Sequence, residues 1–338
     1  MTLGKFVVFA KEKLSGNYDQ RERDNVIGLL MEEMLGLTRH QLRVKLRDEL
    51  SESSRAHLVQ AADLLSKNEP VQYVLGFADF YGMRLKVNHH VLIPRPETEE
   101  LVDYAIKTLR ADFSSALGGE MSATGGQRGS SVSSKPHPLT PQANAGTSPA
   151  NRRGRNAEIK QLHILDIGTG SGCIAIALKK NLPDAIVTAL DSSGEAIAVA
   201  SENAMLQRCD VKFIMKDFLD EKNWKALGAF DVMVSNPPYV TNEEFSEMLP
   251  RVKNFEPRQA LIASGNDPFI FYRKMAEFGK KHLAPGGCIF LELNSAHAKQ
   301  IASMFQKDYR ETILKTDLQG RERILRVSES LKLKDRKA

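Results

Sequence analysis

From residue 162 to about residue 327 the sequence alternates short apolar segments with longer amphipathic ones. The apolar segments predict strands at 162–166, 186–190, 211–215, 230–234, 288–293, 311–315 and 323–327. Helices are expected between them, at 172–181, 194–207 and 268–283. This alternation is typical of an α/β domain with a largely parallel sheet, in which ligands bind at the carboxyl ends of the strands.

The first 72 residues follow a helical pattern instead. Residues 21–35 place apolar side chains near one face of a helix: Val26, Leu29, Leu30, Met34 and Leu35. Thr38 is a candidate N-cap of a further helix, and either Ser51 or Ser53 is a candidate N-cap of the next one. We therefore expect a small all-α domain at 1–72, without catalytic residues.

Two connections complete this organisation. Residues 73–91 alternate aromatic and β-branched side chains around Gly76 and Gly82, which predicts a β-hairpin joining the helical domain to a second domain at 92–330. Pro96 fits the first turn of a helix that opens this second domain. A length of 338 residues, 42% of them hydrophobic, is sufficient for two domains.

The second domain is interrupted. Residues 112–157 consist mostly of Ser, Gly, Thr, Pro, Ala and Asn, so they bury too little apolar surface to offset the entropy of ordering, and we expect a disordered insertion. The chain closes with a basic tail at 331–338. The insertion contains the tripeptide Gly125-Gly126-Gln127.

Composition excludes several classes of protein. A net charge of +5, from 47 basic and 42 acidic residues, is too small to predict specific nucleic-acid binding. Three widely spaced cysteines indicate neither a disulfide framework nor a metal site. No apolar run approaches the roughly 20 residues that span a bilayer. We expect a cytoplasmic monomer without a bound metal.

The first predicted strand leads from Asp166 into a glycine-rich turn, Gly168-Thr169-Gly170-Ser171-Gly172. The glycines let the backbone approach a ligand, and the next helix offers its N-terminus. Nicotinamide-dependent dehydrogenases have a similar turn, but their G-x-G-x-x-G spacing is not matched here.

Two acidic residues follow the next strands. Asp191, at the end of the second strand, can accept hydrogen bonds from the hydroxyls of a ribose; alternatively, it only caps the following helix. Asp217 and Phe218 follow the third strand, where the carboxylate can bind the amino group of an adenine and the ring can pack on its face. Alternatively, Phe218 belongs only to the hydrophobic core.

The most specific segment, Ser235-Asn236-Pro237-Pro238-Tyr239, directly follows the fourth predicted strand. The prolines prevent the strand from continuing and direct backbone carbonyls toward the ligand cleft. An amide NH2 group is a poor nucleophile. The Asn236 side-chain oxygen and the Pro237 carbonyl can accept its two N–H bonds, while Tyr239 packs on the planar group. These contacts would direct the amide nitrogen at the methyl group of a sulfonium cofactor. Such a site works by positioning and desolvation, because the nitrogen, once methylated, loses its proton without a strong base.

Together these segments resemble the PrmC/HemK family, the glutamine methyltransferases of peptide chain release factors. The resemblance covers nearly the whole chain except the insertion, and rests on residues 69–76, 91–99, 168–172, 191, 235–239 and 255–257. It implies a class I (Rossmann-like) S-adenosylmethionine-dependent methyltransferase fold with a seven-stranded, mostly parallel sheet. It also implies that the helical domain helps to bind class I release factors. One departure is Asn294, where the family usually has a glycine.

By position, the resemblance implies cofactor contacts for Gly168, Thr169, Gly170, Ser171, Gly172, Asp191, Phe218 and Asn236. It implies that Asn236, Pro237, Pro238 and Tyr239 bind the glutamine of a Gly-Gly-Gln motif and catalyse methylation of its amide nitrogen. The insertion contains the same tripeptide, Gly125-Gly126-Gln127, which is either a coincidence in a Gly-rich segment or a site of self-methylation or pseudosubstrate competition.

Three alternatives remain open. An adenine amino-group methyltransferase of DNA or RNA uses a related Asn/Asp-Pro-Pro-Tyr site on a flipped base. A non-enzymatic S-adenosylmethionine-binding adaptor would be expected to have a damaged form of this segment. A nicotinamide-dependent dehydrogenase would leave residues 236–239 without a role.

Overall fold

The computed structural model of the protein describes residues 1–116 and 161–330. Its α-helices are α1 (Leu3–Lys13), α2 (Gln20–Leu35), α3 (Arg39–Val44), α4 (Glu52–Ser66), α5 (Val71–Leu75), α6 (Pro96–Ala116), α7 (Cys173–Asn181), α8 (Gly194–Leu206), α9 (Asn242–Glu247), α10 (Pro250–Lys253), α11 (Arg258–Leu261), α12 (Ile270–His282) and α13 (Ala298–Gln306). Three 3-10 turns are η1 (Glu221–Ala226), η2 (Ser264–Asn266) and η3 (Ser295–His297). Its strands are β1 (Phe77–Phe80), β2 (Met83–Lys86), β3 (His163–Ile167), β4 (Ile186–Asp191), β5 (Lys212–Met215), β6 (Phe230–Ser235), β7 (Leu283–Glu292), β8 (Tyr309–Thr316) and β9 (Glu322–Ser330).

Helices α1 to α5 form the predicted all-α unit. The side chains of Thr38 and Ser51 accept hydrogen bonds from backbone N–H groups three residues later, so both residues are N-caps, as expected. The buried face of α2 agrees with the predicted one in part. Leu30 is buried as predicted, and Val26 and Leu35 pack against the same core. Ile27 and Met31 are also buried, whereas 37% of Met34 is exposed.

A short hairpin follows, and it begins later than the predicted boundary at residue 73. Residues 73–75 form the last turn of α5, which ends at Gly76 with φ of 78°. Strands β1 and β2 then pair antiparallel, with Phe80 opposite Met83 across the turn. The helical pattern ends at Gly76 because a left-handed residue terminates a helix.

The second domain contains a seven-stranded sheet in the order β5-β4-β3-β6-β7-β9-β8. All neighbours from β5 to β7 are parallel, and β9 is antiparallel to both β7 and β8. The expectation of a seven-stranded, mostly parallel sheet is confirmed. The chain runs outward from β3 to β5 on one side and from β6 to β7 on the other. Such a reversal of strand order creates a ligand crevice at the carboxyl ends of the strands.

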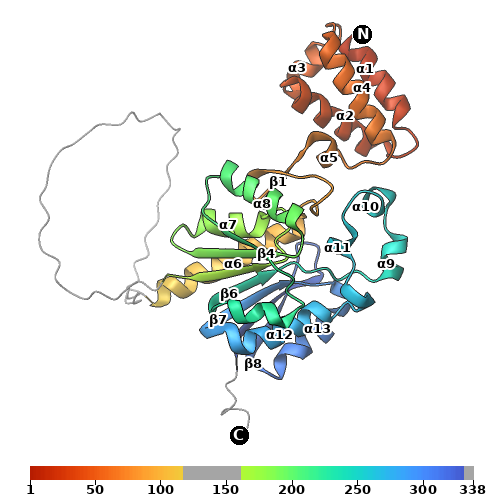
Figure 1. Ribbon diagram of the computed structural model, residues 1–338. Coiled ribbons are helices and arrows are strands. Elements are labelled where there is room, and N and C mark those ends of the chain that lie inside the picture. The colour runs from red at the N-terminus through yellow and green to blue at the C-terminus, as the bar shows by residue number, and fades with distance from the viewer. Residues whose placement is uncertain (117–160, 331–338) are drawn as a thin grey trace, which may run out of the picture. The chain divides into compact units, whose positions relative to one another are not determined.

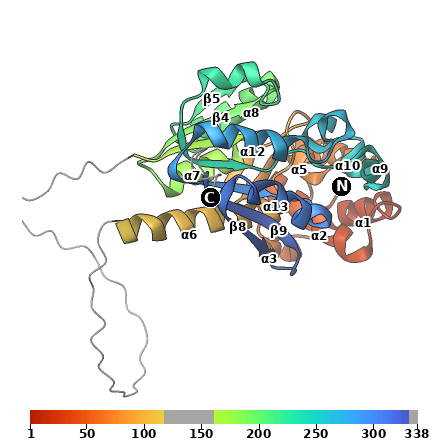
Figure 2. The same ribbon diagram turned by 90° about the horizontal axis from the view of Figure 1, so that it is seen from below.

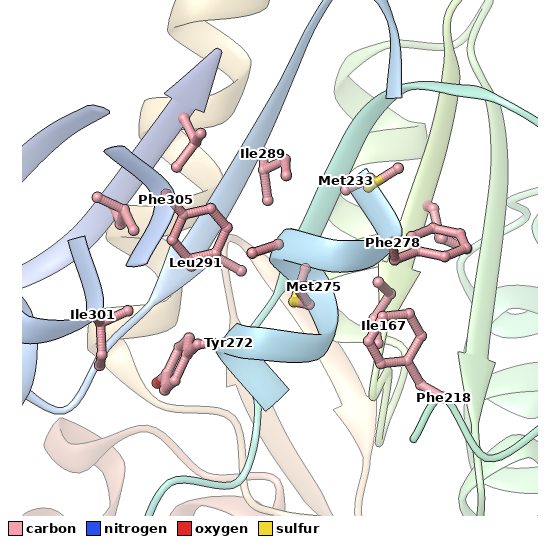
Figure 3. Packing of buried hydrophobic residues seen from close by; sticks show 14 of the residues in the cluster. Ile167, Phe218, Met233, Tyr272, Met275, Phe278, Ile289, Leu291, Ile301 and Phe305 are labelled. Atoms are coloured by element: carbon pink, nitrogen blue, oxygen red, sulfur yellow. The ribbon is translucent and has the colours of Figure 1, made fainter. Parts of the chain in front are cut away.

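Helices cover both faces of this sheet (Figure 1). On one face, side chains of α12 and α13 pack against strand residues including Met233, Ile289 and Leu291 (Figure 3). Because side chains alternate across a strand, Phe290 points to the opposite face, where its ring meets that of Tyr104 from α6 at 5.7 Å between centroids. Figure 2 shows α6 and α12 apart from each other, in agreement with their packing on opposite faces of the sheet.

Some boundaries differ from those expected. Helix α6 continues to Ala116, so the insertion predicted at 112–157 does not begin at residue 112. The rest of that insertion, including Gly125-Gly126-Gln127, lies outside the described residues, as does the predicted tail at 331–338. Strand β7 begins five residues before the predicted Cys288, at Leu283, because the Pro-Gly-Gly segment is included in the strand. In the described part of the chain, no helix combines the length and apolar character needed to cross a lipid bilayer.

The packing of α13 on the sheet can be tested by truncation. Phe305 is fully buried in this layer, so Phe305→Ala is expected to lower the free energy of unfolding by about 3–5 kcal/mol, measured by urea denaturation. Met205→Ala is the control, because Met205 is 75% exposed and its truncation should change that free energy by less than about 0.5 kcal/mol. Equal stability of the two variants would contradict this packing.

Candidate active site

A cleft lies at the carboxyl ends of β3, β4 and β6. Seven of the site residues singled out in the sequence line the cleft: Gly168, Gly170, Asp191, Asp217, Phe218, Asn236 and Pro238. Fold topology therefore brings the glycine turn, the end of β4 and the Asn-Pro-Pro-Tyr segment to one place.

The glycine turn exposes its backbone to the cleft at two positions. Gly168 and Gly170 have φ values of 72° and 54°, in the left-handed region that favours glycine. No atom lies within 4 Å of the position that a Cβ would occupy at either residue. A ligand can therefore approach this backbone closely.

The other three residues of the turn lie behind this surface. Thr169 is buried, and its hydroxyl donates to Asp166 Oδ2 at 2.6 Å. Burial raises the pKa of Asp166 to about 7. A Cβ on Gly172 would lie 3.1 Å from the Cβ of Ala200, so this glycine permits close packing against α8. Direct cofactor contacts from Thr169, Ser171 and Gly172 stay predictions.

Asn203, which sequence reasoning missed, supports the turn from α8. Its buried amide group donates to the carbonyl oxygens of Ser171 and Lys86, at 2.9 and 3.0 Å. Its Oδ1 accepts from the Lys86 N–H at 2.7 Å. One asparagine thus joins the hairpin to the glycine turn. A lone Asn in a helix gives no sequence signal for such a role.

Asp191 is held rigidly at the end of β4. Its two oxygens accept hydrogen bonds from the backbone N–H groups of Gly170 and Ser193, at 2.9 and 3.0 Å. Ser193, not Asp191, is the N-cap of α8, because the Ser193 hydroxyl accepts from the Ala196 N–H. The reading of Asp191 as a mere helix cap is therefore wrong. A carboxylate has about four acceptor positions, so it retains capacity for ribose hydroxyls.

The environment of Phe218 differs from the one expected for a ring that packs on the face of an adenine. Although the residue lines the cleft, its side chain is buried in an aromatic cluster with Trp224 and Phe278, at centroid distances of 5.6 and 5.4 Å. Figure 3 shows Phe218 beside Ile167 and below Phe278. This placement favours the core reading, and a ring contact with adenine stays a prediction.

The Asn-Pro-Pro-Tyr segment is anchored at both ends. Before it, the Ser235 hydroxyl donates to the Ile167 carbonyl at 2.6 Å, which joins the end of β6 to the end of β3. After it, Val240 exchanges backbone hydrogen bonds with Leu261 and Ala263, both at 3.0 Å. This places Asn236 in the cleft on a fixed backbone.

The remaining members of the segment lie deeper. Pro237 is buried. Tyr239 packs against the hydrophobic core between the sheet and helices α12 and α13, and against a smaller cluster that contains Phe245. Burial raises the pKa of the Tyr239 phenol, so the group is neutral near pH 7. Neither residue lines the cofactor cleft. Their contact with a substrate stays a prediction.

Two further residues reach the site from distant segments. Asn236 Nδ2 donates to Thr98 Oγ1 at 3.1 Å, and the Thr98 hydroxyl donates to Glu292 Oε2 at 2.6 Å. Both partners belong to segments conspicuous in the sequence, the Pro-Glu-Thr-Glu run and the end of the fifth strand of the main sheet. Their type and spacing alone gave no role for either side chain.

Asn294 occupies its position without strain. Its φ is −66°, a value open to any residue, so glycine is not required there. Its Oδ1 caps η3 by accepting from the Ala296 N–H, and its Nδ2 donates to Glu244 at 3.0 Å. The departure from the family pattern therefore adds a link to α9 and leaves the cleft intact.

The role expected of Asp191 can be tested by an isosteric change. Asp191→Asn removes the charge that hydrogen bonds from ribose hydroxyls would use, so the Kd for S-adenosylmethionine should rise about 10- to 100-fold in calorimetric titration. Asp184→Asn, at an exposed position just before β4, is the matched control and should bind as the wild type does. An unchanged Kd in Asp191→Asn would exclude this role.

Comparison with known proteins agrees with this geometry. Residues 7–76 match the model of the PrmC N-terminal domain, and residues 155–310 match that of the methyltransferase small domain. The release factor glutamine methyltransferase of Flavobacterium psychrophilum is 33% identical over 318 residues, which are 94% of this chain and 95% of that protein. The enzyme of the same name from Bacteroides thetaiotaomicron is 34% identical over 96% of this chain and 99% of its own length. The chain therefore belongs to the release factor glutamine methyltransferase family.

Proposed function

We propose that this protein transfers a methyl group from S-adenosylmethionine to the side-chain amide nitrogen of the glutamine in the Gly-Gly-Gln motif of class I release factors. Family membership over nearly the full length supports the reaction. The observation that carries the assignment is the position of Asn236, which lines one cleft together with Gly168, Gly170 and Asp191.

The cleft fits a nucleoside cofactor. S-adenosylmethionine, when bound, supplies a methyl group on a positively charged sulfur. Open glycine backbone at Gly168 and Gly170 suits the close approach of its amino acid part, and the Asp191 carboxylate suits its ribose hydroxyls. The cofactor site would extend over residues 168–172, Phe218 and Asn236 by position in the family motif.

The substrate amide is a planar group whose nitrogen lone pair is delocalised. In our proposal the Asn236 Oδ1 and the Pro237 carbonyl accept its two N–H bonds, and Pro238 and Tyr239 enclose the plane. This arrangement fixes the direction of the nitrogen and excludes water from it, which is where the rate enhancement arises. The nitrogen would gain the methyl group as the bond between that group and the sulfonium sulfur breaks, which leaves a neutral thioether, and the nitrogen would lose one proton, which passes to solvent.

The surrounding assignments follow from this reaction. The helical domain at 1–72 would help to hold the release factor, outside the cleft. The protein would act as a monomer in the cytoplasm, where release factors work, which agrees with its few and widely spaced cysteines. An adenine methyltransferase would share the cleft and Asn236, but the matched relatives are named for release factors and not for DNA or RNA.

The proposal is tested by mass spectrometry of a class I release factor after incubation with the protein and S-adenosylmethionine. We expect one added methyl group, on the glutamine of the Gly-Gly-Gln motif. Asn236→Ala should lower the rate at least about 100-fold, because the amide loses one of its two acceptors. A release factor with that glutamine replaced should stay unmodified.

Two other readouts belong to the same experiment. Transfer of the methyl group to adenine in DNA or RNA, with none on the release factor, would replace the proposal by the adenine methyltransferase. A peptide map of the protein itself covers Gln127 of the insertion. An unmodified Gln127 would exclude self-methylation there.

A further inference from the structure

Hydrogen bonds join three polar side chains in a row beneath the cleft. Asn236 lines the cleft, and Thr98 and Glu292 lie behind it, each only 2% exposed. The hydrogen bonds that join them run from Asn236 Nδ2 to Thr98 Oγ1 at 3.1 Å and from the Thr98 hydroxyl to Glu292 Oε2 at 2.6 Å. Burying a threonine and a glutamate is unfavourable unless their polar atoms have partners, so this arrangement calls for an explanation.

The direction of these bonds is determined by donor count. A hydroxyl has one hydrogen to donate, and an ionised carboxylate can only accept. When Thr98 donates to Glu292, its oxygen can only accept, and the group that it accepts from must be the NH2 of Asn236. The opposite orientation of the amide would place Asn236 Oδ1 against an oxygen that has no hydrogen left to offer.

This direction matters for the surface presented to the substrate. With Nδ2 turned toward Thr98, Oδ1 is left as the hydrogen-bond acceptor of Asn236, and no donor in the described part of the chain occupies it. The substrate amide needs an acceptor here, because its own NH2 donates. The reversed side chain would present a donor to a donor.

We infer that Thr98 and Glu292 are positioning residues, which hold the Asn236 amide in the one orientation that accepts a hydrogen bond from the substrate nitrogen. This inference rests on the proposed function, since it assigns these residues a part in the same reaction. Neither side chain touches substrate in it: Thr98 acts through Asn236, and Glu292 acts through Thr98.

The charge on Glu292 determines which groups donate and which accept in these hydrogen bonds. Burial raises the pKa of Glu292 to about 7, while the hydrogen bond from Thr98 and the charge of Arg323 favour ionisation. Arg323 is itself held by Asp317, with 3.3 Å between Nε and Oδ2. Glu97 and Arg95 also act on Glu292, in opposite directions.

Burial raises the pKa of Cys173, the charge of Glu292 raises it further, and two tyrosines lie near Glu292 as well. The Tyr272 hydroxyl donates to the Glu292 backbone carbonyl at 3.1 Å, and the charge of Glu292 also acts on Tyr239. Burial raises the pKa of both phenols, so both are neutral throughout the neutral range. A protonated Glu292 can donate to Thr98, which then can donate to Asn236 Oδ1 and reverse the amide. Above about pH 7 the productive orientation is therefore the one that these hydrogen bonds allow, and its share falls as the pH drops through about 7.

The test is single-turnover methylation of a release factor by full-length Thr98→Val, a substitution of nearly equal shape that removes the hydroxyl. We expect the rate to fall about 10- to 100-fold, while the Kd for S-adenosylmethionine stays close to the wild-type value. The Tm should fall, because Glu292 loses its hydrogen-bond donor, so the rates are compared well below the Tm of both proteins. Thr98→Ser retains the hydroxyl and should recover most of the rate. Thr108→Val, the same change about three turns further along α6, is the matched control and should leave the rate unchanged.

The pH dependence separates positioning from a general structural role. The wild-type rate should fall as the pH is lowered through about 7, and Thr98→Val should lack this fall because its Asn236 is no longer coupled to Glu292. A wild-type rate in Thr98→Val, or a loss of rate accounted for by a weaker Kd for S-adenosylmethionine, would overturn the inference. Should Thr98→Val not fold, a flat wild-type profile through about pH 7 would overturn it as well. Absence of methylation by the wild-type protein would instead refute the proposed function.

Discussion

The site depends on the parallel pairing of β3 with β4 on one side and β6 on the other. All three strands end at the same edge, so the glycine turn, Asp191 and Asn236 meet there although they are far apart in the sequence. The hydroxyl of Ser235 reinforces this pairing by donating to the carbonyl at the end of β3. If β6 paired elsewhere, the Asn-Pro-Pro-Tyr segment would have no cofactor cleft beside it.

Around this edge the protein buries polar side chains at positions where apolar side chains would suffice for a stable core. Asp166, Asn203, Thr98 and Glu292 are all buried, and their hydrogen bonds hold the glycine turn, the hairpin and the Asn236 amide. Such groups destabilise a fold when a partner is missing. Their concentration behind one cleft fits a site whose chemistry depends on orientation more than on a strong acid or base.

Local signals were sufficient for much of the architecture. The strands around the glycine turn and the N-caps at Thr38 and Ser51 were predicted because each depends on a few adjacent residues. The segment between Tyr239 and α12 was not predicted, although Thr241 and Glu244 form a capping box that marks the start of α9. Its helices are so short that an apolar periodicity cannot develop.

The supporting residues of the site could not be predicted for a different reason. Thr98 lies 138 residues from Asn236 and 194 from Glu292 in the sequence, and no local pattern specifies contacts at such separations. Phe218 shows the converse limit. Its position after a strand end suggested a ligand contact, but the aromatic neighbours that hold its ring in the core come from η1 and α12.

The central claim is that Asn236 Oδ1 accepts a hydrogen bond from the glutamine amide that is methylated. A crystal structure of the protein with S-adenosylhomocysteine and a peptide containing Gly-Gly-Gln tests it most directly. The account predicts the glutamine nitrogen about 3 Å from Asn236 Oδ1, on the side of the cleft that faces the cofactor sulfur. A glutamine bound away from Asn236, with the cofactor in place, would contradict it.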